Sequence, residues 1–140
     1  MTNEIVSGVS EVIRVELIDT SDAALAVYST RRLTAAMGFS VTNQYLIAAA
    51  VSELATNIVR YAGQGKITIK TVRNADLEGV EVEARDEGPG IADIDQAMQE
   101  HFSSGNSLGL GLPSVRRIMD EFIIDSKPGR GTTIIARKWR

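Results

Sequence analysis

Residues 42–61 read TNQYLIAAAVSELATNIVRY and form the most clearly helical stretch of the chain. Apolar side chains recur in it at intervals of three and four residues, which is the spacing of one buried face of an α-helix. The recurring apolar residues are Leu46, Ala49, Ala50, Leu54, Ile58 and Tyr61. Thr42 is a suitable N-terminal cap, and Gly63 or Gly65 would end the helix. We therefore predict a long helix with one face on the core.

The segments on both sides of this helix predict two further helices and five strands. Thr20, Ser21 and Asp22 are helix-capping residue types, and Gly38 is typical of the position after a helix end. The expected elements are a strand over 9–17, helices over 23–37 and from Pro113, and strands over 66–73, 80–86, 122–126 and 132–139. Three helices are too few to cover both faces of such a sheet. We predict an α+β fold, a two-layer α/β sandwich with a mixed sheet and helices on one face.

The composition excludes several classes of site. The chain has 140 residues and no cysteine, which excludes disulfide scaffolds, thiolate nucleophiles and zinc–thiolate or iron–sulfur centres. His101 is the only histidine, so multi-histidine metal sites are excluded too. A net charge of −3 disfavours nucleic acid as a partner, and no apolar run is long enough to span a membrane. We expect one cytoplasmic domain over residues 1–140.

Glu53 and Asn57 lie four residues apart on the predicted helix, beside its apolar stripe. One interpretation is a capping or rim pair that reaches solvent. The alternative is a functional pair, because a carboxylate near a core costs several kcal/mol unless it has a partner. An Asn amide oxygen can bind Mg²⁺, and a nearby carboxylate can orient or deprotonate a nucleophile.

Three glycine motifs follow along the chain. Asp86-Glu87-Gly88-Pro89-Gly90 comes directly after a strand, where glycines allow a ligand to approach the backbone closely, although an acidic turn has the same composition. Gly109-Leu110-Gly111-Leu112 precedes a helix start, where free N–H groups can bind an anion. Gly129-Arg130-Gly131-Thr132 taken alone indicates only a hairpin turn.

The order of these motifs resembles the GHKL ATP-binding family, shared by gyrase, Hsp90, histidine kinases and MutL, from about residue 40 to the C-terminus. More closely, the chain resembles the small serine/threonine kinases of anti-sigma regulatory type, the switch kinases of the stressosome, almost end to end. The residues that carry this closer resemblance are Ser52 to Ile58, Asp86 to Ile91, Gly109 to Asp120 with Glu121-Phe122, and Lys138-Trp139. The resemblance implies the Bergerat fold of that family.

By this resemblance the cofactors would be ATP and Mg²⁺. Glu53 would be the general base toward a substrate hydroxyl, Asn57 the Mg²⁺ ligand, and Asp86 the acceptor for the adenine amino group, with Thr132 nearby through water. Gly88 and Gly90 would flank the base, and the amides of residues 109–112 would hold the phosphates. The full predicted nucleotide-binding set is Asn57, Asp86, Gly88, Gly90, Ile91, Gly109, Leu110, Gly111, Leu112 and Thr132.

The segment from Ile91 to Leu108 corresponds to the ATP lid of the family and contains no Lys or Arg, whereas several relatives place a basic residue there. The candidates to compensate are Arg60, Arg116, Arg117 and His101. Each of them also fits a surface position, and Arg116 and Arg117 fit a protein-binding face.

The resemblance implies a serine/threonine kinase that phosphorylates STAS-domain scaffold proteins and activates a PP2C-type phosphatase. The main alternative is a nucleotide-dependent anti-sigma binding protein with little catalysis. A histidine kinase is disfavoured because no additional helical segment carries a phosphoacceptor histidine. A domain that no longer binds nucleotide is the third alternative.

Overall fold

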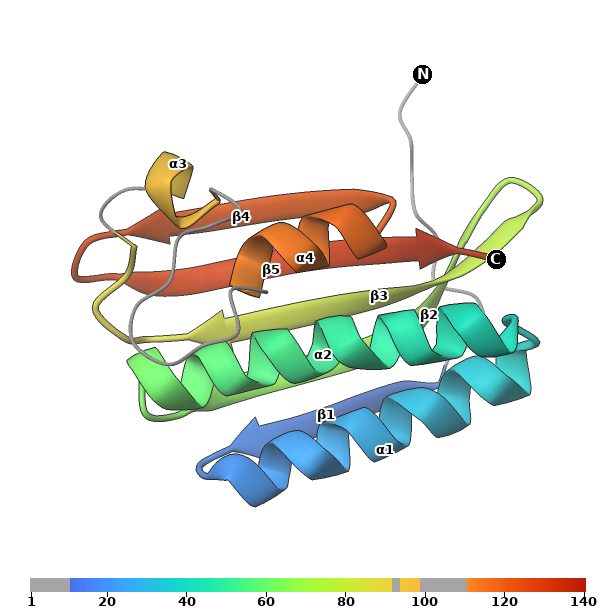
Figure 1. Ribbon diagram of the computed structural model, residues 1–140, viewed down its shortest axis with the longest axis horizontal. Coiled ribbons are helices and arrows are strands. Elements are labelled where there is room, and N and C mark those ends of the chain that lie inside the picture. The colour runs from blue at the N-terminus through green and yellow to red at the C-terminus, as the bar shows by residue number, and fades with distance from the viewer. Residues whose placement is uncertain (1–10, 92–93, 99–110) are drawn as a thin grey trace.

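The computed structural model describes residues 11–91, 94–98 and 111–140. Along the chain it contains β1 (Val12–Leu17), α1 (Thr20–Met37), α2 (Val41–Tyr61), β2 (Gly65–Asn74), β3 (Leu77–Asp86), α3 (Ile94–Ala97), α4 (Gly111–Ile118), β4 (Glu121–Lys127) and β5 (Gly131–Trp139). Helices α1, α2 and α4 lie on one side of the sheet (Figure 1). The predicted α+β sandwich with helices on one face is confirmed. The short helix α3 was not predicted.

The five strands are ordered β1-β2-β3-β5-β4, and every neighbouring pair is antiparallel. The prediction of a mixed sheet was therefore wrong for the described strands. The reason lies in the connections. Two helices, α1 and α2, separate β1 from β2, so the chain returns to the end at which β1 finished, and Leu17 pairs with Gly65. A single crossover helix would have given a parallel pair.

The core lies between the sheet and the helices. On β3, Val80, Val82 and Ala84 face the helices and are buried, whereas Glu81 and Glu83 alternate with them on the opposite face. That opposite face is covered by no helix of the described chain, and charged side chains occupy much of it. Among the described residues, no helix is long and apolar enough to cross a membrane.

Both long helices begin earlier than predicted, α1 at Thr20 instead of residue 23 and α2 at Val41 instead of after a cap at Thr42. The N-cap of α1 is Asp19, which accepts hydrogen bonds from the backbone and hydroxyl of Ser21 and forms a capping box with Asp22. The hydrogen bonds from Ser21 lower the pKa of Asp19 below its ordinary value. The N-cap of α2 is Ser40, and Thr42 lies inside the helix.

The apolar face of α2 differs in part from the prediction. Leu46, Ala49 and Tyr61 are exposed, because the helix is rotated relative to the predicted stripe. Its buried side chains are Ile47, Ala48, Ala50, Val51, Leu54, Ala55 and Ile58. This wider face is buried because α2 packs against α1, α4 and the sheet.

Candidate nucleotide site

Glu53 and Asn57 lie on the flank of α2 that is turned toward α4. Figure 1 shows α2 between α1 and α4. Ser52 and Thr56 line an open hollow of about 420 Å³ between α2 and α1. Glu53 and Asn57 each follow these residues by one position, about 100° further around the helix axis, and so lie on the other flank. The hollow beside α1 is therefore separate from the predicted site.

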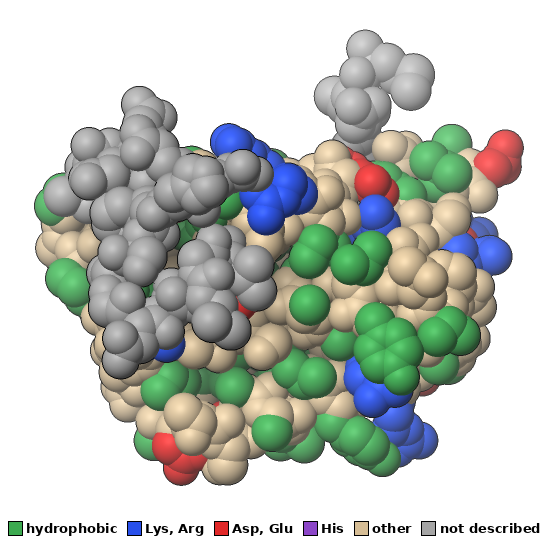
Figure 2. Space-filling model, in the orientation of Figure 1, with side chains coloured by type: hydrophobic (Ala, Val, Ile, Leu, Met, Phe, Trp, Pro, Cys, Tyr) green, Lys and Arg blue, Asp and Glu red, His purple; other side chains and the backbone are tan. Residues whose placement is uncertain are grey.

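The surface around that hollow carries exposed apolar side chains. Green side chains are spread over α1 and α2 in Figure 2, and Leu25, Tyr28 and Tyr45 are each more than half exposed. The guanidinium of Arg31 lies 4.6 Å from the ring centroid of Tyr45 and donates a hydrogen bond to its hydroxyl. None of the predicted nucleotide-binding residues lines this hollow.

The side chains of Glu53 and Asn57 have no hydrogen-bond or ion-pair partner among the described residues. Both are half-buried. Polar groups in such positions are normally paired with protein, water or ligand. A carboxylate and an amide that lie one helical turn apart, without a partner in the described part of the chain, are therefore available to a ligand.

Asp86 and Thr132 face each other at one end of the sheet. They are paired residues of β3 and β5, and both lie on the face that carries the helices. One carboxylate oxygen of Asp86 accepts a hydrogen bond from the backbone of Gly88 at 2.8 Å. The other has no partner among the described residues, so it can accept a hydrogen bond from a ligand.

This end of the sheet lies beneath the C-terminal half of α2. Ile58, the neighbour of Asn57, has its Cγ2 atom 2.6 Å from the point where a Cβ on Gly65 would lie, and Gly65 is the strand partner of Asp86. A Cβ on Gly88 would lie 2.6 Å from the Cβ of Ala62, which follows the end of α2. The helix that carries Glu53 and Asn57 is thus packed against the segment that carries Asp86.

Gly90 and Gly131 are needed where two backbone segments meet. A Cβ on Gly90 would lie 2.2 Å from the carbonyl oxygen of Lys127, and one on Gly131 would lie 2.2 Å from the carbonyl oxygen of Asp86. From the sequence, the glycines after Asp86 were expected to allow the close approach of a ligand. In the structure the groups closest to Gly88 and Gly90 are protein atoms, and their contact with a nucleotide stays a prediction.

Ser126 is a residue of this region that the sequence analysis missed. Its hydroxyl oxygen lies 2.8 Å from the backbone nitrogen of Ile91, which donates to it, and 2.7 Å from the hydroxyl oxygen of Thr132. Ser126 thus connects the loop after Asp86 to the β4–β5 hairpin. The sequence does contain two hydroxyl residues, Ser126 and Thr132, on the two strands of a predicted hairpin. They can be recognised as a pair only when the register of that hairpin is known.

The first turn of α4 is the part of the predicted phosphate site that the structure describes. Gly111 has a φ of 44° and its carbonyl accepts a hydrogen bond from the hydroxyl of Ser114. Leu112 is buried. The backbone N–H groups of a first helical turn lack intrahelical partners and attract anions. Gly109 and Leu110 lie outside the described residues.

Three of the four proposed substitutes for a basic lid residue are described. Arg60, Arg116 and Arg117 are exposed, and the guanidinium of Arg60 lies 6.0 Å from the ring centroid of Tyr61. The fourth, His101, lies outside the described residues, as does much of the predicted lid. A role of any of the four at a phosphate group stays a prediction.

Comparison with known sequences identifies the family. Residues 42–139, most of the chain, match the family described as histidine kinase-, DNA gyrase B-, and HSP90-like ATPase. The protein belongs to this ATPase family. The resemblance inferred from the spacing of the motifs is confirmed, and the antiparallel sheet covered on one face agrees with it.

Similar curated proteins narrow the comparison. The chain is 42% identical over 125 residues to the serine/threonine-protein kinase RsbT of Bacillus subtilis (strain 168), which covers 89% of this chain and 94% of the relative. It is 37% identical over 97 residues to an anti-sigma F factor of Caldanaerobacter subterraneus subsp. tengcongensis, covering 66% and 68%. An anti-sigma F factor of Clostridium acetobutylicum is 35% identical over 94 residues, covering 64% and 65%. The prediction of an ATP-dependent enzyme of the kinase type agrees with the first of these relatives.

Proposed function

We propose that this protein is an ATP-dependent serine/threonine protein kinase. The observation that carries the proposal is the Glu53–Asn57 pair, half-buried, one helical turn apart and without a partner among the described residues. Nucleotide binding alone would require only the Asn57 amide, as a ligand of the metal ion. A carboxylate beside it supplies the base that transfer to a hydroxyl uses, and the identity to a serine/threonine kinase supports this assignment.

The adenine would bind at the end of the sheet. The free carboxylate oxygen of Asp86 would accept a hydrogen bond from the adenine amino group, with Thr132 nearby through water. Gly88, Gly90 and Ile91 would border the base. The loop that carries them is tied to the β4–β5 hairpin by the hydrogen bonds Gly129 N to Pro89 O at 2.7 Å and Ile91 N to Ser126 at 2.8 Å. These two hydrogen bonds, one between backbone groups and one to the Ser126 hydroxyl, support the proposal because they attach the loop that would border the base to the hairpin.

The phosphates would lie between α2 and α4. The backbone amides of residues 109–112 would hold them, and the amide oxygen of Asn57 fits a Mg²⁺ ligand because Mg²⁺ prefers oxygen donors and keeps several waters. When bound, Mg²⁺ neutralises charge on the phosphate oxygens. A Mg²⁺ ion that is bound together with phosphates needs few protein ligands. This is compatible with the described residues, which contain no group of three or more acidic or histidine side chains that could hold a metal by themselves.

Glu53 would act on the substrate hydroxyl. The hydroxyl oxygen attacks the γ-phosphorus, the bond from that phosphorus to the β–γ bridging oxygen breaks, and ADP leaves. The hydroxyl proton passes to the Glu53 carboxylate. Positioning by α2 supplies much of the rate in such transfers, because little covalent chemistry is required of the protein.

The substrates we propose are STAS-domain scaffold proteins, with the regulatory domain of a PP2C-type phosphatase as a second partner. This part of the proposal rests on the resemblance to stressosome switch kinases. The identity to RsbT over 94% of that relative supports it.

Radiolabelled ATP tests the proposal directly. Transfer of the γ-phosphoryl to a purified STAS-domain protein is measured for the wild type, Glu53→Gln and Glu16→Gln. We expect Glu53→Gln to lower the rate at least about 100-fold and to keep its ATP affinity. Glu16 is exposed on β1 and serves as the matched control, so its rate should be unchanged. Equal rates for all three proteins would refute the role of Glu53.

A binding protein without catalysis is the second candidate, because anti-sigma F factors are among the relatives. In that case ATP would promote capture of a partner protein, no label would be transferred, and Glu53→Gln would capture the partner as well as the wild type. A pull-down with and without ATP, run beside the transfer assay, separates the two functions.

A further inference from the structure

Helix α4 has its two ends in different surroundings. Its first turn, from Gly111, carries the amides that the proposed function assigns to the phosphates. Its last turn ends at Ile118, and only Met119 and Asp120 separate it from β4. The helix has 8 residues, a length of about 12 Å. Because so short a helix moves as one body, the position of its last turn also sets the position of its first.

Lys138 holds that last turn. Its ammonium nitrogen donates a hydrogen bond to the carbonyl oxygen of Ile118 at 2.8 Å and lies 3.6 Å from a carboxylate oxygen of Asp120. The side chain is only 17% exposed. The last carbonyl groups of a helix have no intrahelical partner, and a cation beside them is favourable. Lys138 therefore caps α4 from a strand 20 residues further along the chain.

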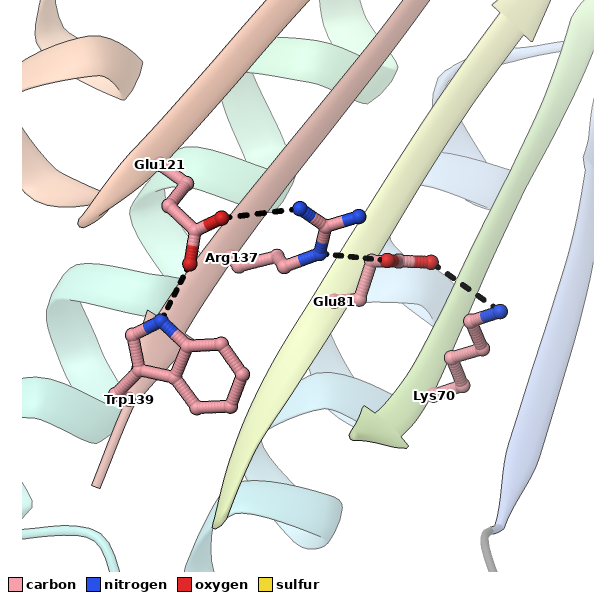
Figure 3. A network of polar contacts seen from close by, with 5 residues as sticks. All are labelled: Lys70, Glu81, Glu121, Arg137 and Trp139. Carbon is pink, nitrogen blue, oxygen red and sulfur yellow. Dashed lines mark hydrogen bonds and ion pairs between the residues drawn. The ribbon is translucent and has the colours of Figure 1, made fainter. Parts of the chain in front are cut away.

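Other contacts join β5 to the turn after α4 independently of Lys138. The backbone nitrogen of Asp120 donates to the carbonyl of Arg137, and the backbone nitrogen of Trp139 donates to the Asp120 carboxylate, both at 2.8 Å. On the opposite face of the sheet, Glu121 binds both Arg137 and the indole of Trp139 (Figure 3).

The contacts around the end of α4 have two different roles. The backbone pairing and Glu121 attach the turn to the sheet, whereas Lys138 alone among these residues contacts the helix itself. Removing its ammonium group should leave the sheet intact and release only the end of α4. The loss of nucleotide affinity should then arise at the first turn of α4, where the phosphates would bind.

We propose that Lys138 is a positioning residue for the phosphate end of the nucleotide site. It fixes the C-terminal turn of α4 on the sheet and so keeps the first-turn amides aligned with the phosphates. The inference rests on the proposed function for the assignment of those amides. In this proposal Lys138 acts through α4 and does not contact the nucleotide.

The test compares nucleotides that differ only in their phosphates. Affinities for ATP, ADP and adenosine are measured by calorimetry or NMR titration for the wild type, Lys138→Met, Lys138→Arg and Lys70→Met. The methionine keeps the apolar stem and removes the charge. We expect Lys138→Met to weaken ATP and ADP about tenfold and to leave adenosine unchanged. Lys138→Arg should restore most of the loss.

Lys70→Met is the matched control. Lys70 also forms an ion pair across this sheet, to Glu81 at 3.3 Å, but on the face without helices, so all three affinities should stay as in the wild type. Equal loss for adenosine and ATP in Lys138→Met, or no loss at all, would overturn the inference. An unfolded Lys138→Met protein would overturn it too, because the inference requires the backbone contacts and Glu121 to maintain the fold without Lys138. If the wild type binds ATP and ADP no more tightly than adenosine, the phosphate assignment of the proposed function is contradicted. If the affinity is lowered only in Lys138→Met, that assignment stays intact.

Discussion

Gly90 and Gly129 have nearly the same backbone conformation but very different surroundings. Their φ angles are 77° and 80°. A Cβ on Gly90 would lie 2.2 Å from the Lys127 carbonyl oxygen, whereas one on Gly129 would meet nothing within 4 Å. We expect Gly129→Ala to lower the free energy of unfolding by about 1 kcal/mol through backbone strain alone. Gly90→Ala should cost about 3 kcal/mol, because the overlap adds to the strain. Urea denaturation measures both, and equal costs would show that the loop moves freely away from the hairpin.

The sequence could suggest candidate residues for the site but not all of the contacts that they make. Glu53 and Asn57 were identified because polar side chains beside a buried helix face need a partner, and Asp86 because it ends a strand just before two glycines. Their roles in nucleotide binding come from the family resemblance and stay predictions. The partners of Gly90 and Gly131 lie on another segment of chain, so no local pattern reveals them. Ser126 was missed for the same reason, since its role depends on its position opposite Thr132 in the hairpin.

Among the elements, the sheet has a ladder of charges on its uncovered face. Lys70, Glu81, Arg137 and Glu121 follow one another across four strands (Figure 3). Burial alone would lower the pKa of Arg137, but its hydrogen bonds to Glu81 and Glu121 outweigh burial and raise that pKa. The guanidinium is therefore held charged by two carboxylates, and the ladder joins β2, β3, β5 and β4.

Glu81→Ala tests this ladder. The Glu81 side chain is 10% exposed, and its removal leaves the largely buried Arg137 with one partner. We expect a loss of about 2–3 kcal/mol in the free energy of unfolding, because breaking a buried pair leaves a poorly compensated charge. Glu78→Ala is the control. Glu78 pairs with Arg73 and Arg140 at 45% exposure, and such surface pairs contribute less than about 1 kcal/mol. Comparable losses in the two variants would mean that the ladder adds nothing beyond surface pairing.

The elements were easier to predict than their packing. The strand predicted over 66–73 was located to within a residue at each end of β2, because a run of strand-forming residues is a local signal. The buried face of α2 was predicted less well, because alanine fits either a buried or an exposed position, and Ala49 is exposed while Ala55 is buried. Strand direction was missed because it depends on the end of the sheet to which the two helices between β1 and β2 return the chain.

At the scale of the whole molecule, the proposed nucleotide would contact several elements that pack against one another. The adenine end involves β3 and β5, the metal end involves α2, and the phosphate end involves α4. In the described residues α4 packs mainly on α2, with fewer contacts to β4 and β5. A ligand that binds all four elements should therefore stabilise the fold as a unit, and its effect should depend on the metal as well as on the base.

Thermal unfolding measures that dependence. At an ATP concentration 100 times the dissociation constant, with Mg²⁺ present, we expect about 2.7 kcal/mol of added stability, or roughly 10 °C in Tm for a chain of this size. Removing Mg²⁺ with EDTA at the same ATP concentration should reduce the shift by more than half in the wild type. In Asn57→Ala the shift should be small and the same with or without Mg²⁺, because the protein ligand of the metal is gone. If instead the wild-type shift is insensitive to EDTA while Asn57→Ala loses it, then Asn57 contacts the nucleotide directly, and Glu53 would have to act without a metal ion held beside it on α2.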